Sequence, residues 1–75
     1  MWTKQQIQEL KRTAYTFYND DYIGEHLAAL NIHLNNADGQ PLFHEKNNEW
    51  RAVEGEASLI AARVASLSIG SNSLN

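Results

Sequence analysis

The chain has 75 residues, a net charge of −3 and no cysteine. A chain of this length forms one small, marginally stable domain, and without cysteine no disulfide or thiolate metal site can reinforce it. The six basic residues are scattered, whereas nucleic-acid binding typically needs a concentrated basic surface. No apolar run approaches the ~18 residues of a membrane span, and the N-terminus lacks the apolar core of a signal peptide. We therefore expect a cytoplasmic protein that binds neither nucleic acid nor membrane.

The first expected helix begins at the start of the chain and ends near residue 19. Thr3 followed by Gln6 is a capping-box pattern, and Trp2 with Ile7 has the spacing of a hydrophobic staple. The segment "NDD" at residues 19–21 offers an end for this helix and an N-cap for the next. Apolar residues recur at steps of three and four along one face: Ile7, Leu10, Ala14 and Phe17.

The second expected helix covers residues 22–35, although its pattern is ambiguous. Ile23, Leu27, Leu30 and Leu34 fit one helical face. The stretch "LNIHLN" alternates apolar and polar residues like a strand, and the turn signal Asp38-Gly39 follows it. The partner strand would begin with Pro41, which cannot donate to a ladder. We predict a helix here, with an α+β fold containing a β-hairpin near residues 30–45 as the alternative.

Residues 37–48 form the expected connection to the third helix. Leu42 and Phe43 are adjacent apolar residues within it. Exposing both would be unfavourable by a few kcal/mol, so we expect them to plug the end of the core, with a peptide-like binding finger as the alternative.

The third expected helix runs from a cap at Asn47 or Asn48 to Gly70, and residues 71–75 are expected to be a flexible tail. The acids between Glu45 and Glu56 are read as a solvated acidic first turn rather than as a mimic of a nucleic-acid backbone. Six residues at heptad spacing form the expected core face: Trp50, Val53, Ala57, Ile60, Val64 and Leu67.

A second series has the same heptad spacing but lies two residues out of phase, which is about 200° around the helix. We call it the second stripe: Ala52, Gly55, Leu59, Ala62, Ser66 and Ile69. A helix that is apolar all round is normally buried all round. Gly55 adds to the argument because glycine costs about 1 kcal/mol in a helix interior and calls for a packing explanation. Either this helix lies between the other two, or the second stripe is an interface. The remaining alternative is that alanine and serine are common on exposed helix surfaces and have no binding role there.

The sequence contains no catalytic or cofactor motif. No "GxSxG" nucleophile motif occurs, and the four glycines are isolated from one another. His26 and His33 would lie about 10 Å apart along a helix, too far to share one ion comfortably, and His44 lies in the connection. We therefore predict no enzyme activity, no cofactor and no metal. A metal-dependent site on the three histidines ranks last among the possible functions.

Aromatic and basic residues gather near the end of the first helix. Tyr15 and Tyr18 lie close in sequence to Lys11 and Arg12, with Tyr22 following. Tyrosine and arginine are enriched at protein interfaces, and aromatic faces beside cations can also hold a base and its phosphate. Plain packing against the second helix is commoner than either, and a small-molecule or nucleotide site ranks last of the three.

Together these patterns predict an all-α domain of about three helices over residues 1–70. The expected function is that of a small regulatory or inhibitory interaction protein, which forms a homo-oligomer and modulates a larger protein partner by occlusion. The alternative is a small-molecule or nucleotide binder with its pocket at an oligomer interface. The residues expected to carry self-association are Gly55, Leu59, Ala62 and Ile69, and those for the partner are Lys11, Arg12, Tyr15 and Tyr18.

Overall fold

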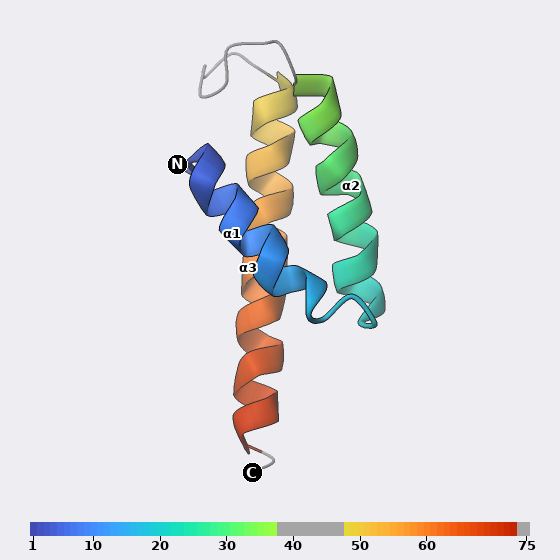
Figure 1. Ribbon diagram of the computed structural model, residues 1–75, viewed down its shortest axis with the longest axis vertical. Coiled ribbons are helices and arrows are strands. Elements are labelled where there is room, and N and C mark those ends of the chain that lie inside the picture. Colours follow the sequence, from blue (N-terminus) through green and yellow to red (C-terminus); the bar gives the residue numbers. More distant parts are fainter. Residues whose placement is uncertain (38–47, 74–75) are drawn as a thin grey trace.

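The computed structural model describes residues 1–37 and 48–73, and these form three helices: α1 (Lys4–Tyr15), α2 (Asp21–Ala37) and α3 (Asn48–Ser73). α2 and α3 lie side by side, and α1 crosses α3 obliquely (Figure 1). The described residues contain no strand, so the predicted all-α fold is confirmed. The alternative hairpin is wrong, because residues 30–37, which would form its first strand, continue α2.

α1 begins with the predicted capping box. The Thr3 hydroxyl accepts a hydrogen bond from the backbone N–H of Gln6 at 3.1 Å, and the Gln6 side-chain oxygen accepts one from the Thr3 N–H at 2.9 Å. These two bonds satisfy backbone donors that a helix start leaves without partners. The predicted apolar face of α1 points into the core, with Ile7 and Ala14 buried.

A short turn connects α1 to α2. The N–H of Phe17 donates to the Ala14 carbonyl, and the N–H of Asp20 donates to the Phe17 carbonyl, both at 2.9 Å. Asp20 then caps α2, because its carboxylate accepts from the N–H of Ile23 at 3.0 Å. α2 exceeds the predicted range by one residue at its start and two at its end.

α3 continues past its predicted end. Gly70 lies inside the helix, which runs on to Ser73, so the expected stop at Gly70 is wrong. Glycine permits the left-handed conformation that ends many helices, but it does not impose it, and a helical glycine costs only about 1 kcal/mol relative to alanine. Residues 71–73, which were expected to belong to a flexible tail, continue α3. The expectations for Leu42, Phe43, His44, Asn47 and residues 74–75 lie outside the described residues.

All three helices contribute to one core. Trp50, Val53, Ala57, Ile60 and Val64 of α3 are buried, and Leu67 packs half-buried against them, so the predicted core face of α3 is confirmed. The other helices supply the remaining buried residues of this cluster: Ile7, Ala14, Ile23, Leu27 and Leu30.

The molecule is long and thin. Its Cα atoms span 44 × 20 × 15 Å, and one helix with its side chains is about 10–12 Å across. The fold therefore has room for only two layers of helices, and every helix keeps one face toward solvent. α3 is also nine residues longer than α2, with its last turns projecting beyond the other helices (Figure 1). No helix in the described part of the chain combines the length and apolarity needed to cross a membrane.

Candidate interaction surface

The second stripe of α3 faces solvent. Leu59 is 44% exposed and Ile69 is 68% exposed. Gly55, Ala62 and Ser66 are also exposed, and only Ala52 is half-buried. α1 and α2 both contact α3, but they leave this side uncovered. The structure therefore brings the predicted self-association residues together on one exposed, uncharged face.

Gly24 of α2 and Gly55 of α3 differ in what surrounds them. A Cβ added to Gly24 would lie 3.3 Å from the backbone oxygen of Tyr18, so the close approach of this turn accounts for that glycine. A Cβ added to Gly55 would meet nothing within 4 Å. Packing against the described residues, 1–37 and 48–73, therefore does not explain why Gly55 stands in the middle of α3.

α1 is attached to one flank of the second stripe through Trp2. The backbone N–H of Trp2 donates to the Glu54 carboxylate at 2.8 Å, and its indole N–H donates to the Ser58 hydroxyl at 3.2 Å. Trp2 itself packs half-buried against the core. The start of α1 is thus held on α3, on the side away from α2.

The opposite flank carries a row of polar pairs to α2. One ion pair and two histidine–glutamate hydrogen bonds make up this row: Arg63 with Asp20 at 2.8 Å, His26 with Glu56 at 2.5 Å, and His33 with Glu49 at 2.8 Å. The members on α3 recur every seven residues, as do the two histidines on α2. Heptad spacing keeps residues on one face of each helix, so antiparallel helices meet repeatedly along this edge.

Sequence reasoning missed this polar row. The signal was present, because Glu49, Glu56 and Arg63 repeat at the spacing of the apolar core residues beside them. The expected solvated acidic turn is therefore only part of the description, because Glu49 and Glu56 contact histidines and Glu54 contacts Trp2. Three acids of that acidic stretch therefore help to hold the helices together.

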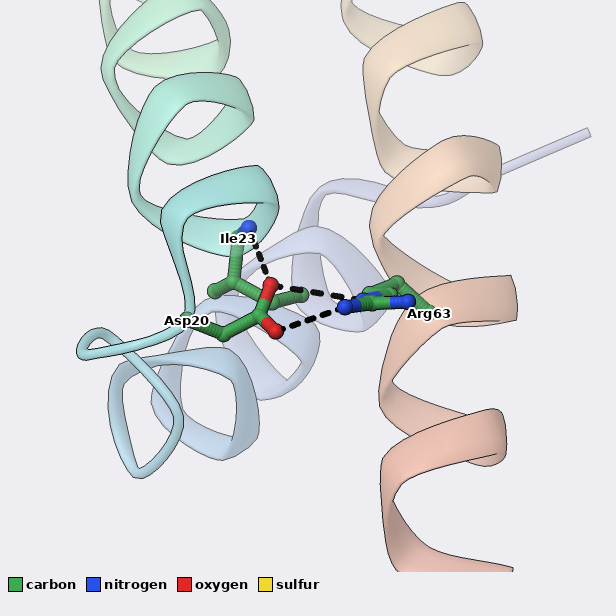
Figure 2. A network of polar contacts seen from close by, with 3 residues as sticks. All are labelled: Asp20, Ile23 and Arg63. Carbon is green, nitrogen blue, oxygen red and sulfur yellow. Dashed lines mark hydrogen bonds and ion pairs between the residues drawn. The ribbon is translucent and has the colours of Figure 1, made fainter.

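Asp20 occupies the most connected position of the row (Figure 2). It accepts hydrogen bonds from Nε and Nη2 of Arg63, at 3.3 and 2.8 Å, in addition to the one from Ile23. The Arg63 hydrogen bonds, followed by that of the Ile23 N–H, hold the pKa of Asp20 below its ordinary value of 3.8. The same carboxylate raises the pKa of Arg63.

Among the described residues, a cation–aromatic contact joins Arg63 to Tyr22, and not Lys11 or Arg12 to a tyrosine. Arg63 lies 5.7 Å from the ring centre of Tyr22, and the Tyr22 ring packs 4.3 Å from that of His26. The distance to Arg63 is within the range of a cation–π contact. Tyr22 thus belongs to the contact between α2 and α3.

The predicted partner-binding residues lie at the C-terminal end of α1 and just after it. Arg12, Tyr15 and Tyr18 are exposed, and Lys11 is half-buried. The Tyr15 hydroxyl accepts a hydrogen bond from the Asn31 side chain of α2 at 3.0 Å. Tyr15 therefore both supports the packing of α1 on α2 and remains accessible.

Neither His26 nor His33 joins a metal-ligating group in the described residues, where no three such side chains gather. Each contacts its own glutamate.

An open groove of about 520 Å³ does occur beside α1, and its described lining is Met1, Trp2, Gln6, Glu9, Leu10 and Thr13. It includes none of the tyrosines or basic residues expected at a nucleotide site.

Comparisons with models of protein families, with curated proteins and with solved structures found no match to this chain. Its function is therefore inferred from its own surface.

Proposed function

We propose that this protein is a non-enzymatic interaction protein that self-associates through the second stripe of α3 and modulates a larger protein by occluding part of its surface. The observation that carries the proposal is the exposure of an uncharged, largely apolar stripe on the same helix whose other side forms the core. Leu59 and Ile69 stand exposed on it, and the other members of the stripe are small and uncharged. Covering these side chains removes apolar surface from water.

The proposed occupant of the second stripe is another copy of this chain. From Ala52 to Ile69 the stripe extends about 26 Å along a helix about 10 Å wide. A contact of this size falls below the ~800 Å² that each partner buries in a typical stable complex. We therefore expect association to be weak, reversible and dependent on protein concentration.

The partner-binding part of the proposal rests on Arg12, Tyr15 and Tyr18. Arginine and tyrosine are enriched at protein interfaces because they combine apolar area with polar ends. These side chains lie on α1 and the turn after it, away from the second stripe, so a dimer would present the surface twice. Two linked copies bind a partner with two sites more tightly than one copy does.

Self-association is tested by light scattering over a concentration series, for the natural chain and for Leu59→Glu. The molar mass of the natural chain should rise toward twice that of the monomer, and Leu59→Glu should stay monomeric, because a charge would be buried in the contact. Ile32→Glu is the matched control, since Ile32 is 59% exposed but lies on α2. Circular dichroism should show all three folded.

Two results would contradict this proposal. One is a natural chain that remains monomeric at millimolar concentration. The other is a dimer that Leu59→Glu leaves intact, or that Ile32→Glu dissociates equally well.

The partner surface is tested separately with a photo-crosslinking residue at position 18, and with the same residue at position 32 as the control. A protein trapped from position 18 only, and lost when Arg12→Glu is added, supports the assignment. Equal crosslinking from positions 18 and 32, or crosslinking from position 18 that Arg12→Glu does not reduce, would contradict the assignment of this surface.

A further inference from the structure

We infer that two copies of α3 pair antiparallel, about a two-fold axis that passes between Leu59 and Ala62 of the second stripe. This inference rests on the proposed function, because it specifies how the copies meet once they associate. A two-fold contact is the commonest arrangement of two identical chains, and in it each residue pair occurs twice.

The sizes of the side chains favour the antiparallel register. About this axis Leu59 faces Ala62 of the second copy, Ile69 faces Ala52, and Gly55 faces Ser66. Each large side chain thus lies opposite a small one, which allows both helices to keep a constant separation along the contact. In a parallel pair each residue would face its own copy. Leu59 and Ile69 would then push the helices apart while Gly55 left a gap.

The register also accounts for Gly55. A Cβ there meets no atom of the described residues within 4 Å, so packing among these residues does not require a glycine. Opposite Ser66 of a second copy, Gly55 lets the two backbones approach closely at a point between two larger side chains. Interaxial distances near the lower end of the usual 8–10 Å range require such small residues at the contact.

Charge complementarity points to the same register. Glu56 and Arg63 flank the second stripe on one side, seven residues apart. The antiparallel arrangement brings Glu56 of each copy beside Arg63 of the other, offset by only about 3 Å along the axis. Like charges do not meet on this flank. Complementary charges of this kind select the orientation of a contact more than its strength.

The existing contacts of these two residues leave room for the new ones. Arg63 uses Nε and Nη2 for Asp20, no described residue accepts from its Nη1, and its side chain is 42% exposed. Glu56 uses Oε2 for His26. The second carboxylate oxygen and the Nη1 group can therefore pair between copies while the polar row to α2 stays intact.

The absence of cysteine makes the register directly testable by disulfide trapping. Ala52→Cys and Ile69→Cys are prepared separately, one of them carrying a mass tag, and are oxidised alone and as a mixture. In the inferred register positions 52 and 69 of different copies face each other, whereas identical positions lie about 26 Å apart. A disulfide requires Cα atoms within about 7 Å. The mixture should therefore give the mixed disulfide, and neither variant alone should crosslink. Ile32→Cys is the control that should not crosslink to any variant.

The outcomes separate this inference from the proposed function. Crosslinking of Ala52→Cys or Ile69→Cys with itself would show a parallel pair and overturn the register, while self-association through the stripe would stand. A dimer in light scattering that yields no mixed disulfide would also overturn the register. A chain that is monomeric in light scattering would remove the proposed function and this inference together.

Discussion

The two sides of α3 have the same heptad spacing and opposite surroundings. The inward side, from Trp50 to Leu67, lies in the core, whereas the second stripe, from Ala52 to Ile69, lies in solvent. Side-chain size separates them, since the inward series contains a tryptophan and several branched residues and the second stripe is mostly small. Burying large apolar side chains offsets the conformational entropy lost on folding, whereas burying alanine, glycine or serine contributes little free energy. The comparison shows that the spacing of apolar residues identifies a face of a helix, whereas the size of their side chains indicates whether that face forms the core.

Truncation of neighbouring residues on the two sides gives the largest expected difference. Ile60 is fully buried, so Ile60→Ala should lower the free energy of unfolding by about 2–5 kcal/mol, whereas Leu59→Ala should change it by less than about 0.5 kcal/mol at low protein concentration. Urea denaturation followed by circular dichroism measures both. Because Ile60→Ala could unfold so small a domain, Ile60→Val, with an expected loss of about 0.5–1.5 kcal/mol, provides a second reading. Equal effects at positions 59 and 60 would mean that the two sides do not differ in burial.

Substituting Gly55 and Gly24 separately by alanine tests the difference between an exposed and a packed position, with a smaller expected effect. Gly55→Ala should stabilise the monomer by up to about 1 kcal/mol, because the new Cβ meets open space and alanine favours the helix. Gly24→Ala should gain less or lose stability, since its Cβ would press on the Tyr18 carbonyl at 3.3 Å. Thermal denaturation of dilute samples measures both changes.

The Gly55→Ala variant also bears on the second stripe as an interface. If the backbones of two copies approach closely at this position, the same substitution that stabilises the monomer should weaken association in the light-scattering series. Unchanged association would show that Gly55 does not lie at a close contact.

The smallest expected effect concerns Asp20 and the polar row. Asp20→Asn keeps a side-chain oxygen that can cap α2 but removes the charge facing Arg63, whereas Asp20→Ala removes both. We expect Asp20→Asn to destabilise the fold less than Asp20→Ala at neutral pH. A difference of the opposite sign would mean that the cap contributes nothing.

The pH dependence follows from the direction of the Asp20 shift. The pKa of Asp20 is lower in the folded chain than its ordinary value of 3.8, so the carboxylate contributes stability above about pH 4 and loses it as the pH falls through the lowered value. The stability difference between the natural chain and Asp20→Asn should therefore be constant near neutral pH and shrink below pH 4. Urea titrations at several pH values measure it, and a difference that persists at low pH would exclude this origin.

Local signals in the sequence predicted the fold well. The capping box at Thr3 and Gln6 starts α1, and the Asp20 cap starts α2, because these bonds form between residues three apart and need no tertiary contact. The end of α3 was predicted wrongly at Gly70 because a glycine only permits a helix to stop. Whether it stops depends on the groups that follow.

The candidate site was predicted less completely. The second stripe was found from spacing, and its exposure became known only from the placement of α1 and α2. The polar row was missed because pairs such as His33 with Glu49 join residues of different helices. Arg12, Tyr15 and Tyr18 lie on α1 and in the turn after it. Among the described residues, the arginine that contacts an aromatic ring is Arg63, which lies 41 residues after Tyr22 in the chain.

The sequence by itself determined three helices, their starts and the inward face of each, because caps and apolar periodicity act over a few residues. Only the tertiary structure decided which side of α3 remains in solvent and which charged residues pair. Both depend on how helices that are distant in sequence pack, since covering a face or forming an ion pair requires a partner that no local pattern specifies.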